Sequence, residues 1–245
     1  MAYIKTGAIF LFIIFAMIVL IPFGLLSFFL SFFGSNRLIG FALYKTAQAW
    51  AKVLIAFTGC PMTVTGRENI PKKDGVCFVS NHVGIFDVVL AMAYAGRPFG
   101  FIAKKELIML PGINIWIYLL GGLFIDRRKP RKALKTINTG IRRIKAGGAM
   151  LIFPEGTRSR GGGLAPFHPG SLKLASQSEA LIVPIAITGS YDVFEKTYLV
   201  HTVPVYISFL PPVDPAELPP QDRKTLLAEK LHTEIAEVLK QQRSG

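Results

Sequence analysis

The first 60 residues of this 245-residue chain contain no acidic side chain, and residues 7–33 carry no charged side chain of either sign. The chain has only two cysteines, Cys60 and Cys77, which are too few for a disulfide framework or a cysteine metal cluster. No G-x-S-x-G elbow occurs either. These absences exclude a disulfide-stapled secreted domain and a serine hydrolase of the elbow type.

The chain is rich in hydrophobic residues and in positive charge. Hydrophobic residues make up 51% of the sequence, and the formal net charge is +13. An excess of this size indicates an anionic partner, which is nucleic acid, an anionic membrane surface or a phosphorylated substrate. The apolar N-terminus favours the last two, and we expect no nucleic-acid partner.

Residues 7–33 form a long apolar run. One straight helix over this run would reach about 40 Å, more than the roughly 30 Å hydrocarbon core of a bilayer. Pro22 and Gly24 interrupt the pattern, which predicts either one kinked span or a re-entrant hairpin of two short halves. A cleaved signal peptide fits less well, because only Lys5 precedes the run and no clear A-x-A cleavage site follows directly after it. We expect a retained membrane anchor.

Residues 37–57 are apolar with a thin basic edge. This composition fits a helix at a membrane interface, and a core helix of the following domain is the alternative. The basic edge favours the cytosolic side. The expected organisation is therefore a membrane-anchoring helical part over residues 1–58 and an α/β domain over residues 59–245, with its site at the cytoplasmic face of the inner (cell) membrane.

After residue 59, short apolar runs alternate with helical stretches. This alternation predicts the α/β class, with a mixed, mostly parallel sheet covered by helices on both faces. The expected strands are 76–80, 99–103, 122–125, 149–153, 181–187 and 203–209. The expected helices are 87–95, 131–146, 171–178 and 223–241. Pro184 inside the fifth strand predicts an edge or a bulge.

His82 and Asp87 follow the first expected strand and are five residues apart. On one unbroken helix they would lie about 140° apart, so they meet only if His82 is on the loop and Asp87 in the first helical turn, with Gly84 turning the backbone. A histidine held by a carboxylate takes a proton from an alcohol as that alcohol attacks a carbonyl. By spacing alone, a loop histidine followed by a helix-capping aspartate is an equal alternative.

Cations stand at the ends of the next three expected strands: Lys104, Arg127 and Arg158. In open α/β sheets the ligand binds outside the strand ends, so these cations are expected to meet His82 around one anionic ligand. Arg127 can instead pair with its neighbour Asp126 as part of the fold.

The string Phe153-Pro154-Glu155-Gly156-Thr157-Arg158 is typical of a phosphate site. Gly156 frees backbone N–H groups, and Thr157 offers a hydroxyl. Arg158 offers a bidentate fork, which Glu155 can orient unless it binds a substrate hydroxyl instead. A charged turn at a strand end is the structural alternative.

Residues 127–145 hold nine Lys or Arg and no acid. Such a run predicts a membrane-facing surface or a site for an acidic carrier protein, and a solvated helix face is the alternative.

Four sequence blocks in order resemble the glycerolipid acyltransferases of the bacterial 1-acylglycerol-3-phosphate acyltransferase (lysophosphatidic acid acyltransferase) type. The blocks are Asn81-His82-x4-Asp87, Gly122-Leu123-Phe124-Ile125-Asp126-Arg127, Phe153-Pro154-Glu155-Gly156-Thr157-Arg158 and Val183-Pro184-Ile185-Ala186. The resemblance spans about residues 60–210 and implies that His82 is the general base and Asp87 its orienting partner. It also implies that the phosphate of the acceptor is held by Lys104, Arg127, Glu155, Gly156, Thr157 and Arg158.

The resemblance further implies a reaction. An acyl group would pass from acyl-CoA or acyl carrier protein to the sn-2 hydroxyl of lysophosphatidic acid, giving phosphatidic acid in phospholipid biosynthesis at the membrane. No metal or redox cofactor is expected. The alternatives are a sibling enzyme that uses glycerol 3-phosphate, a lysophospholipid or an aminolipid as acceptor, and a non-catalytic protein that binds membrane lipids.

Overall fold

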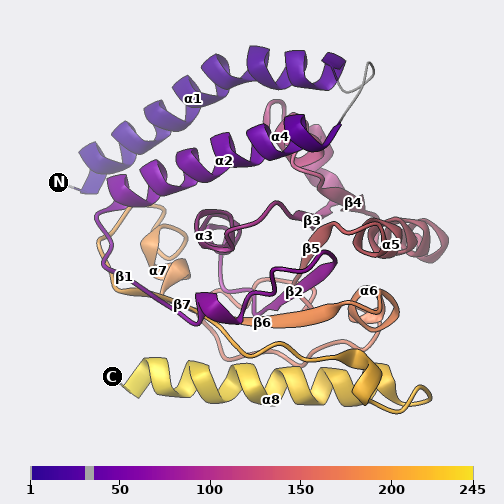
Figure 1. Cartoon of the computed structure of the whole chain (residues 1–245). Coiled ribbons are helices and arrows are strands. Elements are labelled where there is room, and N and C mark those ends of the chain that lie inside the picture. The colour runs from indigo at the N-terminus through magenta and orange to yellow at the C-terminus, as the bar shows by residue number, and fades with distance from the viewer. Residues whose placement is uncertain (1, 31–35, 245) are drawn as a thin grey trace.

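The structure is a computed structural model and describes residues 2–30 and 36–244. Two long helices precede an α/β sheet (Figure 1). The strands are β1 (Met62–Thr65), β2 (Val76–Ser80), β3 (Gly100–Lys104), β4 (Leu123–Ile125), β5 (Ala149–Ile152), β6 (Leu181–Thr188) and β7 (Val205–Phe209). The α-helices are α1 (Ala2–Leu30), α2 (Asn36–Thr58), α3 (Phe86–Tyr94), α4 (Ile113–Leu119), α5 (Pro130–Lys145), α6 (Lys173–Gln177), α7 (Ser190–Val193) and α8 (Arg223–Ser244). Short 3-10 turns are η1 (Arg67–Asn69), η2 (Lys105–Met109) and η3 (Pro215–Glu217).

The seven strands of the described chain form one sheet in the order β1-β7-β6-β2-β5-β3-β4. Neighbouring strands are parallel except β6 and β7, which are antiparallel. The predicted mixed, mostly parallel sheet is confirmed. The prediction missed β1 because a four-residue edge strand is too short to show a clear period.

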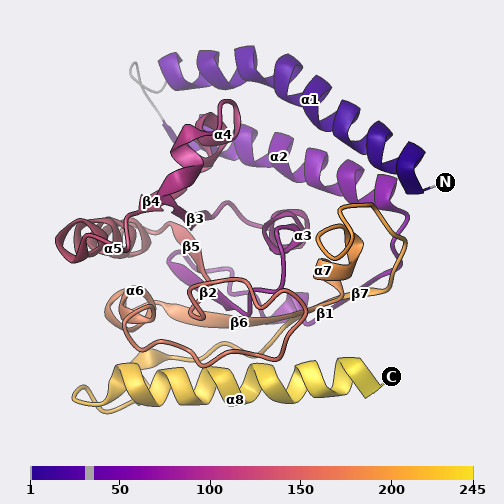
Figure 2. The same cartoon turned by 180° about the vertical axis from the view of Figure 1, so that it is seen from behind.

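Helices cover both faces of this sheet, as predicted, and Figures 1 and 2 show the two layers. Alternate residues of a strand point to opposite faces. Accordingly Val76 and Phe78 pack in the core under α1 to α4, whereas Cys77 and Val79 pack in the core under α5, α6 and α8. The central strand β2 is thus buried on both sides.

Pro184 lies in the interior of the sheet, because β6 pairs with β2 on one side and with β7 on the other. The N–H of Leu210 donates to the Pro184 carbonyl (2.9 Å), and the next link between these segments is the Ile182–Val213 bridge. Two residues on one segment therefore face one residue on the other, which is a bulge. Of the two predicted alternatives, the bulge is the one observed, and the N–H that Pro184 lacks faces this interruption of the ladder.

α1 runs continuously from Ala2 to Leu30 with Pro22 inside it. Of the two expected alternatives, the re-entrant hairpin of two short halves is therefore wrong, and one helix with Pro22 inside it is observed. A proline removes one backbone hydrogen bond, and the rest of the helical ladder continues past it. Gly24 has a packing role instead, since a Cβ there would lie 2.7 Å from the Leu119 side chain in α4.

α1 lies lengthwise along the molecule, antiparallel to α2 (Figure 1). Its buried stripe includes Thr6, Ile9 and Ala16, and the Thr6 hydroxyl accepts a hydrogen bond from the Val200 N–H (2.8 Å). The opposite face is apolar and exposed, with Tyr3, Ile4, Leu11, Ile14, Phe15, Ile18, Val19, Leu25 and Leu26. Within the described residues, one helical stretch (Ala2–Leu26) is long and apolar enough to cross a bilayer.

α2 combines features of both predicted alternatives for its segment. Tyr44, Ala51 and Leu54 are buried in the core against the α/β part. Phe41 and Val53 are exposed on the other side. The helix thus carries core packing on one face and an exposed apolar strip on another.

Candidate active site

The chain leaves β2 at Ser80 and enters α3 at Phe86, and the loop between them carries the histidine. Asn81 fixes the start of this loop by exchanging two hydrogen bonds with the Ile187 backbone in β6 (2.9 and 2.8 Å). His82 lies on the loop and Asp87 in the first turn of α3, with 2.7 Å between Nδ1 and Oδ2. This is the arrangement that the five-residue spacing required.

The Asp87 carboxylate is fully buried, and hydrogen-bond donors surround it. Oδ2 accepts the Val83 N–H (2.7 Å) and the Gly84 N–H (3.0 Å) in addition to the His82 ring. Oδ1 accepts the Ser190 hydroxyl from α7. Both oxygens act as acceptors, so the proton of the His82–Asp87 bond lies on Nδ1, and Nε2 keeps its lone pair.

The His82 ring is held from two further directions. It stacks on Phe153 at the end of β5, with ring centroids 4.0 Å apart and an angle of 17° between planes. Its backbone N–H donates to Glu155 Oε1 (2.6 Å). The side chain remains 19% exposed, which leaves one edge of the ring open to a substrate.

Gly84 is needed for close packing around the histidine loop, and its backbone is not in the left-handed conformation. It is not among the glycines with positive φ. A Cβ at Gly84 would lie 2.6 Å from Glu195 Oε2 and 3.3 Å from the Tyr191 Cα. The absence of a side chain therefore lets α7 and the segment after it pack directly over the histidine loop.

The strand-end cations share one edge of the sheet. β2, β5, β3 and β4 are adjacent and parallel, so their carboxyl ends lie together. His82, Arg158, Lys104 and Arg127 stand at or just beyond these ends in that spatial order. The predicted common edge is confirmed, although the four side chains do not all reach the same hollow.

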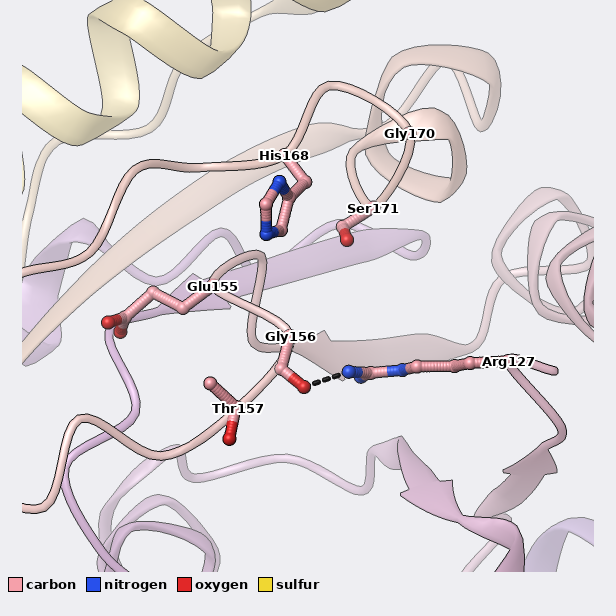
Figure 3. A pocket seen from close by; sticks show the side chains of 7 residues that line it. All are labelled: Arg127, Glu155, Gly156, Thr157, His168, Gly170 and Ser171. Atoms are coloured by element: carbon pink, nitrogen blue, oxygen red, sulfur yellow. Dashed lines mark hydrogen bonds between the residues drawn. The ribbon is translucent and has the colours of Figure 1, made fainter.

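An open hollow of about 460 Å³ lies at this edge (Figure 3). Its lining is Arg127, Glu155, Gly156, Thr157, His168, Gly170 and Ser171. Arg127 extends across from the end of β4 and donates to the Gly156 carbonyl. Gly156 has φ of 75°, in the region that favours glycine. A cation, a hydroxyl and an irregular backbone turn therefore meet here, as expected for a phosphate site.

Sequence reasoning missed His168 and Ser171, which line the same hollow (Figure 3). They belong to the loop between β5 and α6, and the His168 N–H donates to the Pro154 carbonyl (3.1 Å). Neither follows a strand end or a recognisable motif. A histidine just before a Pro-Gly turn was the available signal, and it is a weak one.

The Glu155 carboxylate accepts hydrogen bonds from two backbone N–H groups of different loops. Oε1 accepts the His82 N–H, and Oε2 accepts the Ala165 N–H (3.0 Å). The side chain is buried, which raises the pKa of this carboxyl. In Figure 3 the carboxylate points away from Arg127. Glu155 thus ties the histidine loop to the loop after β5, and its assignment to phosphate binding stays a prediction.

Arg158 pairs with Glu195, and the expected pairing with Glu155 is not formed. The other oxygen of Glu195 accepts the Ile85 N–H from the histidine loop. Glu195 thus links the two loops of the site. It lies 37 residues from Arg158 and outside every motif, so no sequence signal pointed to it.

Lys104 lies apart from the hollow. Its side chain is 73% exposed, and its ammonium is 3.9 Å from the Glu106 carboxylate. Lys104 does not line the hollow around Arg127. Its role toward a phosphate stays a prediction.

No group of three or more His, Cys, Asp or Glu side chains is placed to hold a metal ion within residues 2–30 and 36–244. Cys60 and Cys77 are both free and buried, and burial raises the pKa of the Cys77 thiol. The side chains gathered at the carboxyl edge are an acid–base pair, cations and hydroxyls.

Known proteins are similar to this chain in sequence and in architecture. A family model described as Acyltransferase matches residues 61–188. A 1-acyl-sn-glycerol-3-phosphate acyltransferase of Borreliella burgdorferi is 33% identical over 168 residues, 68% of this chain and 67% of that protein. One of the same name from Limnanthes douglasii is 35% identical over 66% of this chain, which spans 58% of that relative's length. The crystal structure of the 1-acyl-sn-glycerophosphate acyltransferase PlsC from Thermotoga maritima superimposes with a TM-score of 0.83 at 25% identity, covering 100% of this chain and 99% of that one.

Proposed function

Because this chain belongs to the acyltransferase family that includes the 1-acyl-sn-glycerol-3-phosphate acyltransferases, we propose that it transfers a fatty acyl group to the sn-2 hydroxyl of lysophosphatidic acid. The product is phosphatidic acid, for phospholipid biosynthesis. The observation that carries the proposal is the His82–Asp87 pair at the same sheet edge as the hollow that Arg127 enters. A base and a cationic hollow at one edge of the sheet match an acceptor that bears both a hydroxyl and a phosphate.

The proposed chemistry uses Nε2 of His82 as general base. Nε2 takes the proton of the acceptor hydroxyl while the oxygen attacks the thioester carbonyl, which forms the new C–O bond. The tetrahedral intermediate then expels the thiolate, and the imidazolium returns the proton to sulfur. The buried Asp87 carboxylate stabilises the imidazolium between the two steps.

The acceptor phosphate is proposed to bind where Arg127, Gly156 and Thr157 line the hollow. A guanidinium presents its donors in a fork that matches phosphate oxygens. Arg158 stands beside this site with one nitrogen on Glu195, which leaves its remaining donors for a ligand.

The acyl donor is proposed to be an acyl thioester, on coenzyme A or on acyl carrier protein, and it is a co-substrate. Transfer of an acyl group from a thioester to a hydroxyl is redox-neutral. The proposed mechanism therefore assigns no step to a redox cofactor or a resident metal.

We place the protein at the cytoplasmic face of the cell (inner) membrane, with residues 1–58 as the anchoring part and residues 59–245 as the catalytic part. α1 contacts the α/β part near its start through Thr6 and near its end through Gly24. A helix held along its length in this way lies flat against the domain, with an apolar face left outward. We propose that this outward apolar face lies in the plane of one leaflet.

The test is an acyl-transfer assay in detergent or liposomes with lysophosphatidic acid, glycerol 3-phosphate and lysophosphatidylcholine as parallel acceptors. We expect product from lysophosphatidic acid. Preference for one of the other acceptors would keep the chemistry and replace the substrate. No transfer to any acceptor, with the protein folded, would favour a non-catalytic lipid-binding protein instead.

Arg127→Gln is expected to raise the KM for lysophosphatidic acid about tenfold or more while lowering kcat less. The change removes a charge-assisted contact to phosphate, which is worth about 1.5–3 kcal/mol. Initial-rate kinetics against acceptor concentration measures the split. Arg128→Gln, at the next residue and outside the hollow lining, is the matched control. Equal KM values for Arg127→Gln and wild type would remove Arg127 from the phosphate site.

Single cysteines at Ala2→Cys and Ser35→Cys are expected to react with a membrane-impermeant maleimide from the same, cytoplasmic side. Both native cysteines are buried, so background labelling is expected to be low. Inside-out and right-side-out membrane vesicles provide the two sides. Labelling from opposite sides would mean that residues 7–33 span the bilayer.

A further inference from the structure

α5 begins at the active-site edge of the sheet. It follows β4, whose carboxyl end lies beside those of β3, β5 and β2, and only a short loop separates Arg127 from Pro130. Because the next strand, β5, is parallel to β3, α5 must run back from that edge. Its amino end therefore lies close to the hollow that Arg127 enters.

The exposed side of α5 is basic. We define the basic face as Arg131, Lys132, Lys135 and Arg142, all exposed. Arg131, Lys132 and Lys135 have no ion pair or side-chain hydrogen bond with the described residues, and Arg142 donates only to the Thr139 hydroxyl.

No acidic residue stands in the first turn of α5. Cations there oppose the positive end of the helix dipole. The cations of the basic face therefore repel one another, and those in the first turn also interact unfavourably with the helix dipole. An anionic partner bound to this face would offset both effects.

The shape of this face favours a macromolecular partner. From Arg131 to Arg142 the helix extends about 16 Å, and an exposed helix side is convex. Nucleotide-sized ligands are bound in concave sites. A convex basic stripe is complementary to an acidic protein surface.

A bilayer is the weaker partner for this face. Helices that lie on membranes bury an apolar face in the lipid, whereas Ile137 and Ile144 of α5 are buried in the protein core. Of its large apolar side chains, only Leu134 is strongly exposed. In Figures 1 and 2, α5 lies at the level of the sheet, away from the layer of α1 and α2 that carries the proposed membrane face.

We propose that the basic face of α5 is the docking surface for an acidic acyl-carrying protein. The inference rests on the proposed function, since such a partner would bring the acyl thioester to the carboxyl edge of the sheet. Docking on α5 places the carrier beside Arg127 and within reach of His82 by a flexible prosthetic arm.

The experiment compares Arg131→Glu/Lys135→Glu with wild type, using palmitoyl-loaded bacterial acyl carrier protein and palmitoyl-CoA as separate donors. Lys72→Glu/Lys73→Glu is the matched control, because it makes the same charge change at two exposed residues before β2, at the opposite edge of the sheet. Binding of fluorescently labelled carrier protein is titrated in parallel, so that docking is measured without catalysis.

We expect kcat/KM with the carrier donor to fall about tenfold or more in Arg131→Glu/Lys135→Glu, with a matching loss of carrier binding. The palmitoyl-CoA rate should change far less. Carrier binding by wild type should weaken steeply as ionic strength rises from about 0.05 to 0.5 M. The control variant should behave as wild type in each assay.

Four outcomes would overturn the proposal. In the first, wild type does not bind the carrier; in the second and third, Arg131→Glu/Lys135→Glu lowers kcat/KM equally with both donors, or only with palmitoyl-CoA. In the fourth, this variant loses binding to anionic vesicles while carrier binding persists. If carrier binding depends on α5 but no acceptor is acylated, the proposed function fails and the docking surface stands.

Discussion

His82→Ala should lower kcat for acylation of lysophosphatidic acid by about 10³-fold, within the range of about 10² to 10⁴ that a positioned general base contributes. A factor of 10³ corresponds to about 4 kcal/mol of barrier. The ring edge is exposed, and Asp87 and Phe153 hold the ring, so its loss removes the proton acceptor from the site. The measurement is kcat at saturating acceptor and donor, with thermal unfolding checked alongside.

His168→Ala is the matched control, because it tests whether the loss of kcat is specific to His82. His168 is exposed and lines the hollow around Arg127, so it is the other imidazole available to a substrate there. We expect His168→Ala to change the KM for the acceptor more than kcat. A larger loss of kcat for His168→Ala than for His82→Ala would transfer the role of base to His168.

The fold was predictable where the sequence repeats a physical period. The buried strand Val76–Ser80 begins with four apolar residues in a row, and the six predicted strands were located within a residue or two. The helix predicted over residues 131–146 is observed as α5, Pro130–Lys145. Short elements such as α7 and β1 have too few residues to show a period, and their formation depends on packing against distant segments.

At Pro22 the sequence left two alternatives open, one kinked helix or a hairpin of two short helices, and the structure has the single helix. The local preference of this proline to end a helix was overridden, because α1 is supported by lateral packing along its length, with Gly24 fitted against α4. Local propensities are weak compared with such tertiary contacts.

In the site, the residue types and the His82–Asp87 pair were predictable, and the partners of Glu155 and Arg158 were not. The spacing of His82 and Asp87 required a loop followed by a helix start, and the structure has it. The tie from Glu155 to the His82 backbone and the pairing of Arg158 with Glu195 depend on which loops the fold brings together. Such contacts join segments far apart in the chain, and no local pattern encodes them.

Asp87→Asn should lower kcat by about 10²-fold or more while leaving the site in place. The side-chain oxygen that accepts His82 Nδ1 also accepts the backbone N–H groups of Val83 and Gly84. Asparagine must therefore keep its oxygen at this position, because its amide NH₂ would meet three donors there. The NH₂ then faces the Ser190 hydroxyl, which can rotate and accept.

This geometry makes Asp87→Asn a test of charge with little change of shape. The histidine keeps its tautomer, and only the carboxylate that stabilises the imidazolium is lost. Asp87→Ala removes the acceptor for all four donors of a fully buried group, so we expect it to lower both kcat and the free energy of unfolding. Ser190→Ala, which removes one donor to Oδ1, should cost the least. If Asp87→Asn retains wild-type kcat, the carboxylate charge contributes nothing to proton transfer, and Asp87 serves only to hold the loop.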